Sequence, residues 1–276
     1  MHDSYFEHRD YLSGLDCNFR CVKDCHAPGC WRADVVVEVT FFDLIRIGLS
    51  CNNSVSILFF NHCYVGFQDF ELNPRYKRIV VKLKKPCHFL HETTCKVHES
   101  KPLSCILFPE IQQINGLMHE LSRSQIFSKF PCIKDTIVVS EKRSKALKKL
   151  KQISLNERAL SCYLLFKTPS LIIDSKPLSK RLKRENGKNR QFSVQDFERI
   201  VLENFKKSGL LDGIMEEISN LDTRLGMESI FEKINDDALM SQLLEKMIYP
   251  EFIHRLKGDH VKRIRRKLQL PEVAFM

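Results

Sequence analysis

The sequence lacks the motifs that identify several common enzyme classes. Only ten of the 276 residues are glycine, and none of the patterns GxGxxG, GxSxG, or GxxxxGK followed by Ser or Thr occurs. A Rossmann-type methyltransferase domain or a nucleotide-binding domain is therefore not expected. No window approaches the roughly 18 consecutive apolar residues of a membrane-spanning helix, so we expect no membrane partner.

The first ten residues, MHDSYFEHRD, lack the apolar core of a secretory signal. We therefore expect a cytoplasmic protein in a reducing compartment. Hydrophobic residues make up 43% of the chain and charged residues 28%, which is ordinary for a globular protein. The length is enough for one large domain or two modest ones, each with its own core.

Two features are unusual, namely a net charge of +10 and eleven cysteines. The charge is concentrated in residues 141–190, which hold 15 Lys or Arg against 4 Asp or Glu. We interpret this segment as a solvated, lysine-rich helix face with a linker. Binding of nucleic acid through residues 141–190 is an alternative, because clustered cations release counterions from a phosphate backbone. The few aromatic residues in the segment do not favour that alternative.

Local patterns predict a mixed N-terminal region. The β-branched run at residues 35–39 predicts a strand. Thr40 and Asp43 have the spacing of a helix N-terminal cap and its reciprocal acid, so a helix is expected over FFDLIRIGL. This capping role explains Asp43, and we do not assign it as a general base. Two further strands are expected at residues 54–60 and 78–83.

The Asn115-Gly116 dipeptide predicts a two-residue hairpin turn. From about residue 191 the apolar residues follow helical spacing, with breaks expected at Gly209, Gly226 and Pro250. We therefore expect an α+β protein. An irregular cysteine-rich metal-binding domain (residues 1–140) is followed by a basic connector (residues 141–190) and a small all-helical C-terminal domain (residues 191–276).

Eight of the cysteines form two groups separated by a long gap. These are Cys17, Cys21, Cys25, Cys30, Cys87, Cys95, Cys105 and Cys132. In a chain of this length without an export signal, metal binding is a better expectation than disulfides. Thiolates are soft, charged ligands that suit zinc and iron–sulfur clusters. The first group matches neither the CxxC knuckles of common zinc fingers nor the CxxxCxxC of radical S-adenosylmethionine enzymes.

The segment PCHFLHETTCKVHESKPLSCILFPE, residues 86–110, resembles a signature of the zinc- or iron-chelating cysteine-cluster (CxxCxxCC) family. The pattern of that family is roughly PCxFLxxxxCxIYxxRPxxCRxFP. The matching positions are Pro86, Cys87, Phe89, Leu90, Cys95, Pro102, Cys105, Phe108 and Pro109. The resemblance covers about residues 15–135 and includes all eight cysteines, with the strand and Asp-containing helix between the two groups.

The chain also departs from the pattern of this family. Gly29-Cys30 replaces the usual CysCys pair, and Trp31 after it is similar to the branch that includes flagellin lysine N-methylases. Lys101 and Ile106 stand where the family has arginines. A guanidinium is not interchangeable with an ammonium or an isoleucine, so an anion-binding role of those arginines does not carry over.

The resemblance implies a metal-binding protein that holds zinc or an iron–sulfur cluster through the eight cysteines. We expect two sites, because four ligands per site is usual. One alternative is a methyltransferase-like enzyme with S-adenosylmethionine as donor and a protein substrate. Another is a nucleic-acid-binding zinc module. The remaining cysteines, Cys51, Cys63 and Cys162, are expected outside the site. The nearby histidines are candidate spare ligands or proton carriers, namely His26, His88, His91 and His98.

Overall fold

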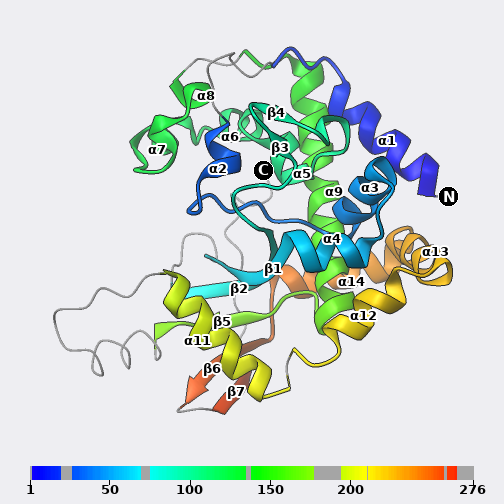
Figure 1. Cartoon of the computed structure of the whole chain (residues 1–276), viewed down its shortest axis with the longest axis vertical. Helices are drawn as coiled ribbons and strands as arrows, with labels where there is room; N and C mark the ends of the chain where they lie inside the picture. Colours follow the sequence, from blue (N-terminus) through cyan, green and yellow to red (C-terminus); the bar gives the residue numbers. More distant parts are fainter. Residues whose placement is uncertain are drawn as a thin grey trace. The chain divides into compact units, whose positions relative to one another are not determined.

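The computed structural model describes residues 2–19, 27–69, 75–134, 138–176, 194–209, 211–257 and 260–265. They form two compact units (Figure 1). Unit 1 is drawn from Met1–Tyr64 and Lys82–Glu157, and unit 2 from Val65–Val81 and Arg158–Ala274. The two units are thus interleaved along the sequence, and each is described by itself.

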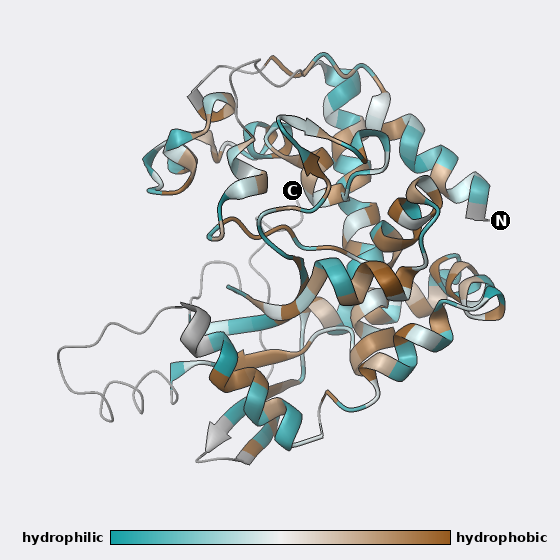
Figure 2. Cartoon of the chain, in the orientation of Figure 1, coloured by the Kyte–Doolittle hydropathy of each residue, from teal (hydrophilic) through white to brown (hydrophobic). Residues whose placement is uncertain are grey.

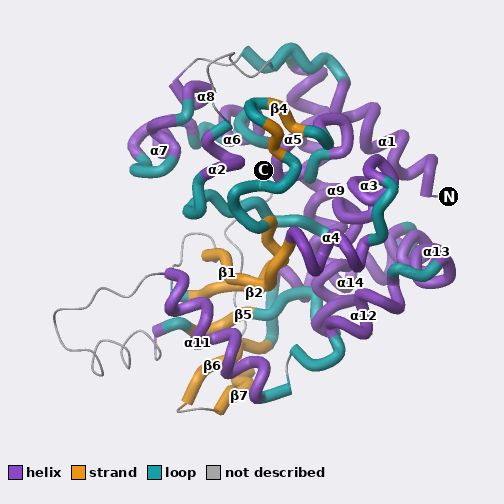
Figure 3. Tube along the Cα trace, in the orientation of Figure 1, coloured by secondary structure: helices purple, strands orange, loops and turns teal. Residues whose placement is uncertain are grey.

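Unit 1 is mainly helical (Figure 3). Its helices are α1 (His2–Gly14), α2 (Pro28–Trp31), α3 (Phe41–Cys51), α4 (Val55–His62), α5 (Leu103–Leu107), α6 (Glu110–Ile114), α7 (Met118–Arg123), α8 (Pro131–Lys134) and the first part of α9 (Glu141–Phe166). Its smaller elements are the paired strands β3 (Leu90–His91) and β4 (Thr94–Cys95) and the 3₁₀ helices η1 (His98–Ser100) and η2 (Phe127–Lys129).

The core of unit 1 forms where α9 packs against the short helices. Leu147 and Leu150 of α9 lie in one buried cluster with Leu12 of α1 and with Leu103 and Leu107 of α5. The lysines of the first half of α9 stay on its solvent side, where Lys145 pairs with Glu141 at 2.6 Å. The long helix therefore serves as the support on which α1 and α5 are placed.

Helix α3 confirms the capping prediction. The Thr40 side chain accepts from the Asp43 backbone N–H, and the Asp43 side chain accepts from the Thr40 backbone N–H. The helix is largely hydrophobic (Figure 2), and most of its apolar side chains are buried. Near its end, a Cβ on Gly48 would lie 2.6 Å from the Asn53 carbonyl oxygen, so only glycine allows this tight exit from the helix.

Unit 2 is built on a five-stranded sheet with the order β1-β2-β5-β6-β7. The strands are β1 (Cys63–Asp69), β2 (Tyr76–Leu83), β5 (Ile172–Asp174), β6 (Phe252–Lys257) and β7 (His260–Arg265). Strand β5 pairs antiparallel with β2 and parallel with β6, while β6 and β7 form an antiparallel pair. Helix α11 (Val194–Lys207) places Val201 and Phe205 in a cluster with Phe67, Ile79 and Ile173 of the sheet.

Three more helices complete the described part of unit 2, namely α12 (Ile214–Leu221), α13 (Arg224–Ile234) and α14 (Asp237–Ile248). Thr223 and Asp236 cap α13 and α14 by accepting backbone N–H groups. The helical stripes expected here are confirmed for α11 and α14. The break expected at Gly226 is wrong, because Gly226 lies inside α13.

Several other expectations are corrected by the structure. The C-terminal region is not all-helical, because β6 and β7 add two strands to the sheet. Residues 54–60 lie in helix α4 and not in a strand, because the Ser54 side chain caps the helix by accepting the Ile57 N–H. The Asn115-Gly116 turn joins helices α6 and α7 and is not a hairpin.

Other expectations of the same kind have mixed outcomes. Residues 35–39 form only an isolated bridge, between Glu38 and Lys82, whereas the strand expected at 78–83 is confirmed as part of β2. Within the basic connector, α9 and β5 are described, and residues 177–193 lie outside the described residues. Helices together with a mixed sheet agree with the α+β class. In the described part of the chain, no helix has the length and apolar character needed to cross a membrane.

Candidate metal centre

Cys30 and Cys87 of the predicted ligand set contact each other through both their backbones and their thiols. The backbone N–H of Cys87 donates to the Cys30 carbonyl oxygen at 2.8 Å, and the two thiols are hydrogen-bonded to each other. Cys30 lies on α2, and Cys87 lies in the loop after β2, next to Pro86. Two segments that are 57 positions apart in the sequence are therefore joined at this point.

The surroundings of Cys87 favour its thiolate form. The hydrogen bond with Cys30 is the main cause that lowers the pKa of Cys87 to about 6; burial opposes it, and the backbone N–H groups of Phe89 and Leu90 and the charge of Lys85 contribute to the lowering. The same hydrogen bond, together with burial, raises the pKa of Cys30. Backbone N–H groups directed at a sulfur stabilise negative charge on it, which is what a thiolate ligand requires.

Cys105 and Cys95 approach the same pair from two other elements. Cys105 lies on α5, and burial raises the pKa of its thiol to about 12, with repulsion from the Cys87 thiolate contributing. Cys95 is the last residue of β4. Burial and electrostatic repulsion from Cys87 raise the pKa of its thiol, and a hydrogen bond from the Val97 backbone N–H opposes them. Three thiols from three elements of unit 1, those of Cys30, Cys95 and Cys105, therefore interact with Cys87.

Lys85, like Lys101, carries a positive charge that lowers the pKa of thiols in this region. Its ammonium group donates to the Gly29 carbonyl oxygen, next to Cys30, and interacts electrostatically with Cys30, Cys87 and Cys105. The sequence analysis did not assign Lys85 a role, although it directly precedes the Pro86-Cys87 start of the motif. That adjacency was the one signal that could have identified it.

Of the other four cysteines of the predicted set, Cys17 and Cys132 lie in described segments. Cys17 is exposed after α1 and interacts electrostatically with Arg143. Cys132 lies on α8 and packs against the cluster of Val35, Phe130 and Ile133. Cys21 and Cys25, together with the neighbouring His26, lie outside the described residues. The ligand set of eight cysteines stays a prediction.

Of the three cysteines outside the predicted set, Cys51 and Cys162 have no described interaction with Cys87, whereas Cys63 interacts electrostatically with it. Cys63 is buried at the start of β1, and burial raises the pKa of its thiol to about 12. Cys51 neighbours Ser50, and Cys162 lies on α9 in unit 2.

Of the candidate histidines, His88 stacks on His62 with 4.0 Å between ring centroids. His91 ends β3, and His98 begins η1. The structure therefore gives none of these three imidazoles a described place beside the thiol pair.

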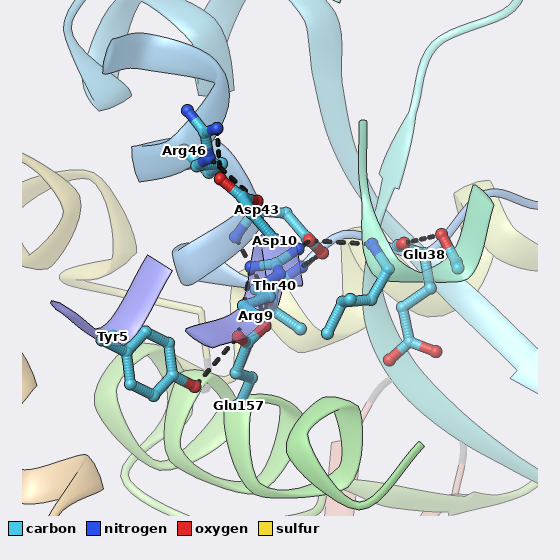
Figure 4. A network of polar contacts seen from close by, with 10 residues as sticks. Tyr5, Arg9, Asp10, Glu38, Thr40, Asp43, Arg46 and Glu157 are labelled. Atoms are coloured by element: carbon cyan, nitrogen blue, oxygen red, sulfur yellow. Dashed lines mark hydrogen bonds and ion pairs between the residues drawn. The ribbon is translucent and has the colours of Figure 1, made fainter. Parts of the chain in front are cut away.

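A buried polar network lies beside the centre in unit 1 (Figure 4). The guanidinium of Arg9 bonds to Asp43 and, at 3.1 Å, to Glu157, and these three side chains are at most 2% exposed. Thr40 and Tyr5 donate hydroxyl hydrogen bonds to Glu157 at 2.9 and 3.0 Å. The side chains of Asp43 and Glu157 therefore both bond to the Arg9 guanidinium in a buried environment.

The thiols do not yet surround a common point. Among the described residues, no group of three or more His, Cys, Asp or Glu side chains is close enough to hold a metal ion. The donor chemistry nevertheless fits a thiophilic metal, because it combines four thiols with N–H groups directed at two of the sulfurs. No family model, curated protein or solved structure matches this chain.

Proposed function

We propose that the protein binds zinc or iron through thiolates gathered around Cys87. The observation that carries this proposal is the arrangement of Cys30, Cys95 and Cys105 around Cys87, each from a different element of unit 1. Four thiolates are the usual ligand number of a structural zinc site and of a cubane iron–sulfur cluster. The resemblance of residues 86–110 to the cysteine-cluster family supports the same conclusion.

The electrostatics of the site support a bound cation. Four thiolates in one place repel one another, and Lys85 with the backbone N–H groups of Phe89, Leu90 and Val97 offsets only part of that charge. A divalent metal or a cluster would supply the remaining positive charge. When bound, zinc would stabilise unit 1, and an iron–sulfur cluster would add electron-transfer chemistry.

The first test is the iron and zinc content of protein purified without oxygen and without added metal. About four irons per chain would indicate a cubane cluster, and one or two zincs would indicate structural sites. Folded protein that contains neither iron nor zinc would refute the proposal.

Variants identify the ligands. Cys87→Ser should remove the metal of the site, whereas Cys162→Ser, in unit 2, should leave the metal content unchanged. Cys17→Ser and Cys132→Ser then distinguish four ligands from eight. Loss of metal in either variant supports the larger set, and full retention in both restricts the site to the group around Cys87.

The methyltransferase-like and nucleic-acid-binding alternatives stay predictions. The first requires methyl transfer from S-adenosylmethionine to lysines of a protein substrate, which is measured as a mass shift of that substrate. The second requires a salt-dependent mobility shift with RNA or DNA. The exposed, partly paired lysines of α9 agree with the simpler interpretation of a solvated face.

A further inference from the structure

Helix capping does not account for all the bonds of Asp43. One carboxylate oxygen, Oδ2, accepts from the Thr40 backbone N–H at 2.9 Å, which is the capping contact. The other oxygen, Oδ1, accepts from the backbone N–H of Leu103 at 3.0 Å and from the Arg9 guanidinium. Leu103 is 60 positions further along the chain and is the first residue of α5.

Helix α5 needs such external support. It has five residues, and isolated helices of that length are not stable in water. Its described anchors include the bond from Leu103 to Asp43, the buried side chains of Leu103 and Leu107, and a bond from the Ser104 hydroxyl to the Glu38 carbonyl oxygen at 2.7 Å. Cys105 lies between these anchors in the sequence, so the place of its thiol depends on them.

Arg9 holds the carboxylate of Asp43 in the orientation that this contact requires. The guanidinium of Arg9 is fixed on its other side by Glu157, which belongs to α9. The chain of contacts therefore runs from α9 through Arg9 and Asp43 to the first N–H of α5. Each link is a charge-assisted hydrogen bond in a buried setting, which makes it stronger than a neutral bond.

We propose that Asp43, oriented by Arg9, is a positioning residue that holds α5 so that Cys105 stays beside Cys87. The reason for holding Cys105 in place rests on the proposed metal function, but the position of Cys105 itself can be measured without metal. Asp43 touches no ligand in this role and acts only through the backbone of Leu103.

The test measures how fast each cysteine is alkylated by iodoacetamide in metal-free, reduced protein, with peptide mass spectrometry as the readout. Asp43→Ala should accelerate alkylation of Cys105 by about tenfold, as expected for loss of one charge-assisted hydrogen bond to a short helix. Asp43→Asn should accelerate alkylation less than Asp43→Ala, because its one amide oxygen can still accept from Leu103, although its NH2 group then faces the Thr40 N–H. Cys162, in unit 2, should react at an unchanged rate in every variant.

Asp10→Asn is the matched control. Asp10 also joins α1 to α3, through a 2.5 Å ion pair with Arg46, but its described bonds do not reach α5. This variant should leave the rate of Cys105 unchanged. An equal acceleration in Asp10→Asn and Asp43→Ala, or an equal acceleration of all cysteines, would mean general loosening and would overturn the proposal.

Folded Asp43→Ala protein with an unchanged Cys105 rate would also overturn it. If this variant does not fold, hydrogen exchange of the Leu103 amide in the wild-type protein tests whether Leu103 is bonded to Asp43. Slow exchange is expected, and exchange at the rate of an unprotected amide would refute the contact. Metal content of the same samples tests the proposed function separately, because wild-type protein without metal would refute that function and leave the alkylation result standing.

Discussion

Replacing Glu157 by Gln should change how the stability of unit 1 depends on pH. Burial raises the pKa of Glu157 to about 7; Arg9 opposes this effect and the second carboxylate, Asp43, adds to it. The folded protein therefore binds a proton between pH 4.5 and 7 that the unfolded chain releases. Stability from this residue is present below about pH 4.5 and is lost as the pH rises towards 7.

The size of the effect follows from the two pKa values of Glu157. A shift from 4.5 to about 7 corresponds to about 3 kcal/mol in total, of which about 2–3 kcal/mol falls between pH 5 and pH 8. Glu157→Gln keeps the shape of the side chain but cannot ionise. The free energy of unfolding of the variant, relative to wild type, should therefore rise by about 2–3 kcal/mol from pH 5 to pH 8.

The assay is urea denaturation at constant ionic strength, at pH 5, 6, 7 and 8. Trp31 is the only tryptophan and lies in unit 1, so its fluorescence reports on the unit that contains Glu157. The control is Glu141→Gln, which removes an exposed glutamate of the same helix and should show no such trend. A constant difference between Glu157→Gln and wild type at all four pH values would refute the reasoning, because both carboxylates would then be ionised.

Three further predictions concern other parts of the chain. Leu147→Ala should destabilise unit 1 by about 2–5 kcal/mol in urea, because Leu147 is fully buried, whereas Leu49→Ala at a 53% exposed position should cost less than about 0.5 kcal/mol. Burial opposes ionisation of Asp174, but bonds from Arg75 and Arg255 lower its pKa to about 2. Asp174→Asn should therefore cost unit 2 about 1–2 kcal/mol at pH 7 and less at pH 3, and an equal loss at both pH values would contradict this. Zinc added to metal-free protein at pH 7 should release about three protons per site, measured by calorimetry in buffers of different ionisation enthalpy, and zinc binding without proton release would contradict thiolate ligation.

The elements predicted correctly from the sequence are those determined by nearby residues. Helix α3 was predictable because Thr40 and Asp43, which cap it, are three positions apart. Helices α11 and α14 were predictable because their buried residues repeat at helical spacing. In the run at 54–60, the apolar residues have no clear period, and the Ser54 cap outweighed the β-propensity of its valine and isoleucine.

The elements missed are those that depend on distant partners. Strand β6 pairs with β5 through Ile173 and His254, which are 81 positions apart, so no local pattern could indicate this pairing. The candidate site also has a part that nearby residues determine and a part that depends on distant partners. Cys87, Cys95 and Cys105 were grouped by the motif that contains them, whereas the bond from Asp43 to Leu103 links two segments whose proximity only the fold establishes.

The pKa shifts of the thiols indicate how a bound cation would change their protonation. Burial and the negative charge of Cys87 raise the pKa of Cys95 and Cys105, and the hydrogen bond to Cys87 raises that of Cys30. Without a cation, the group therefore holds one thiolate and three thiols, and the Cys30 thiol donates to the sulfur of Cys87 instead of facing an ion. Four converging thiolates become favourable only when a cation takes the place of those three protons. By the same reasoning, a site of this kind would prefer soft metals, since a hard cation such as magnesium gains too little from sulfur to displace the protons.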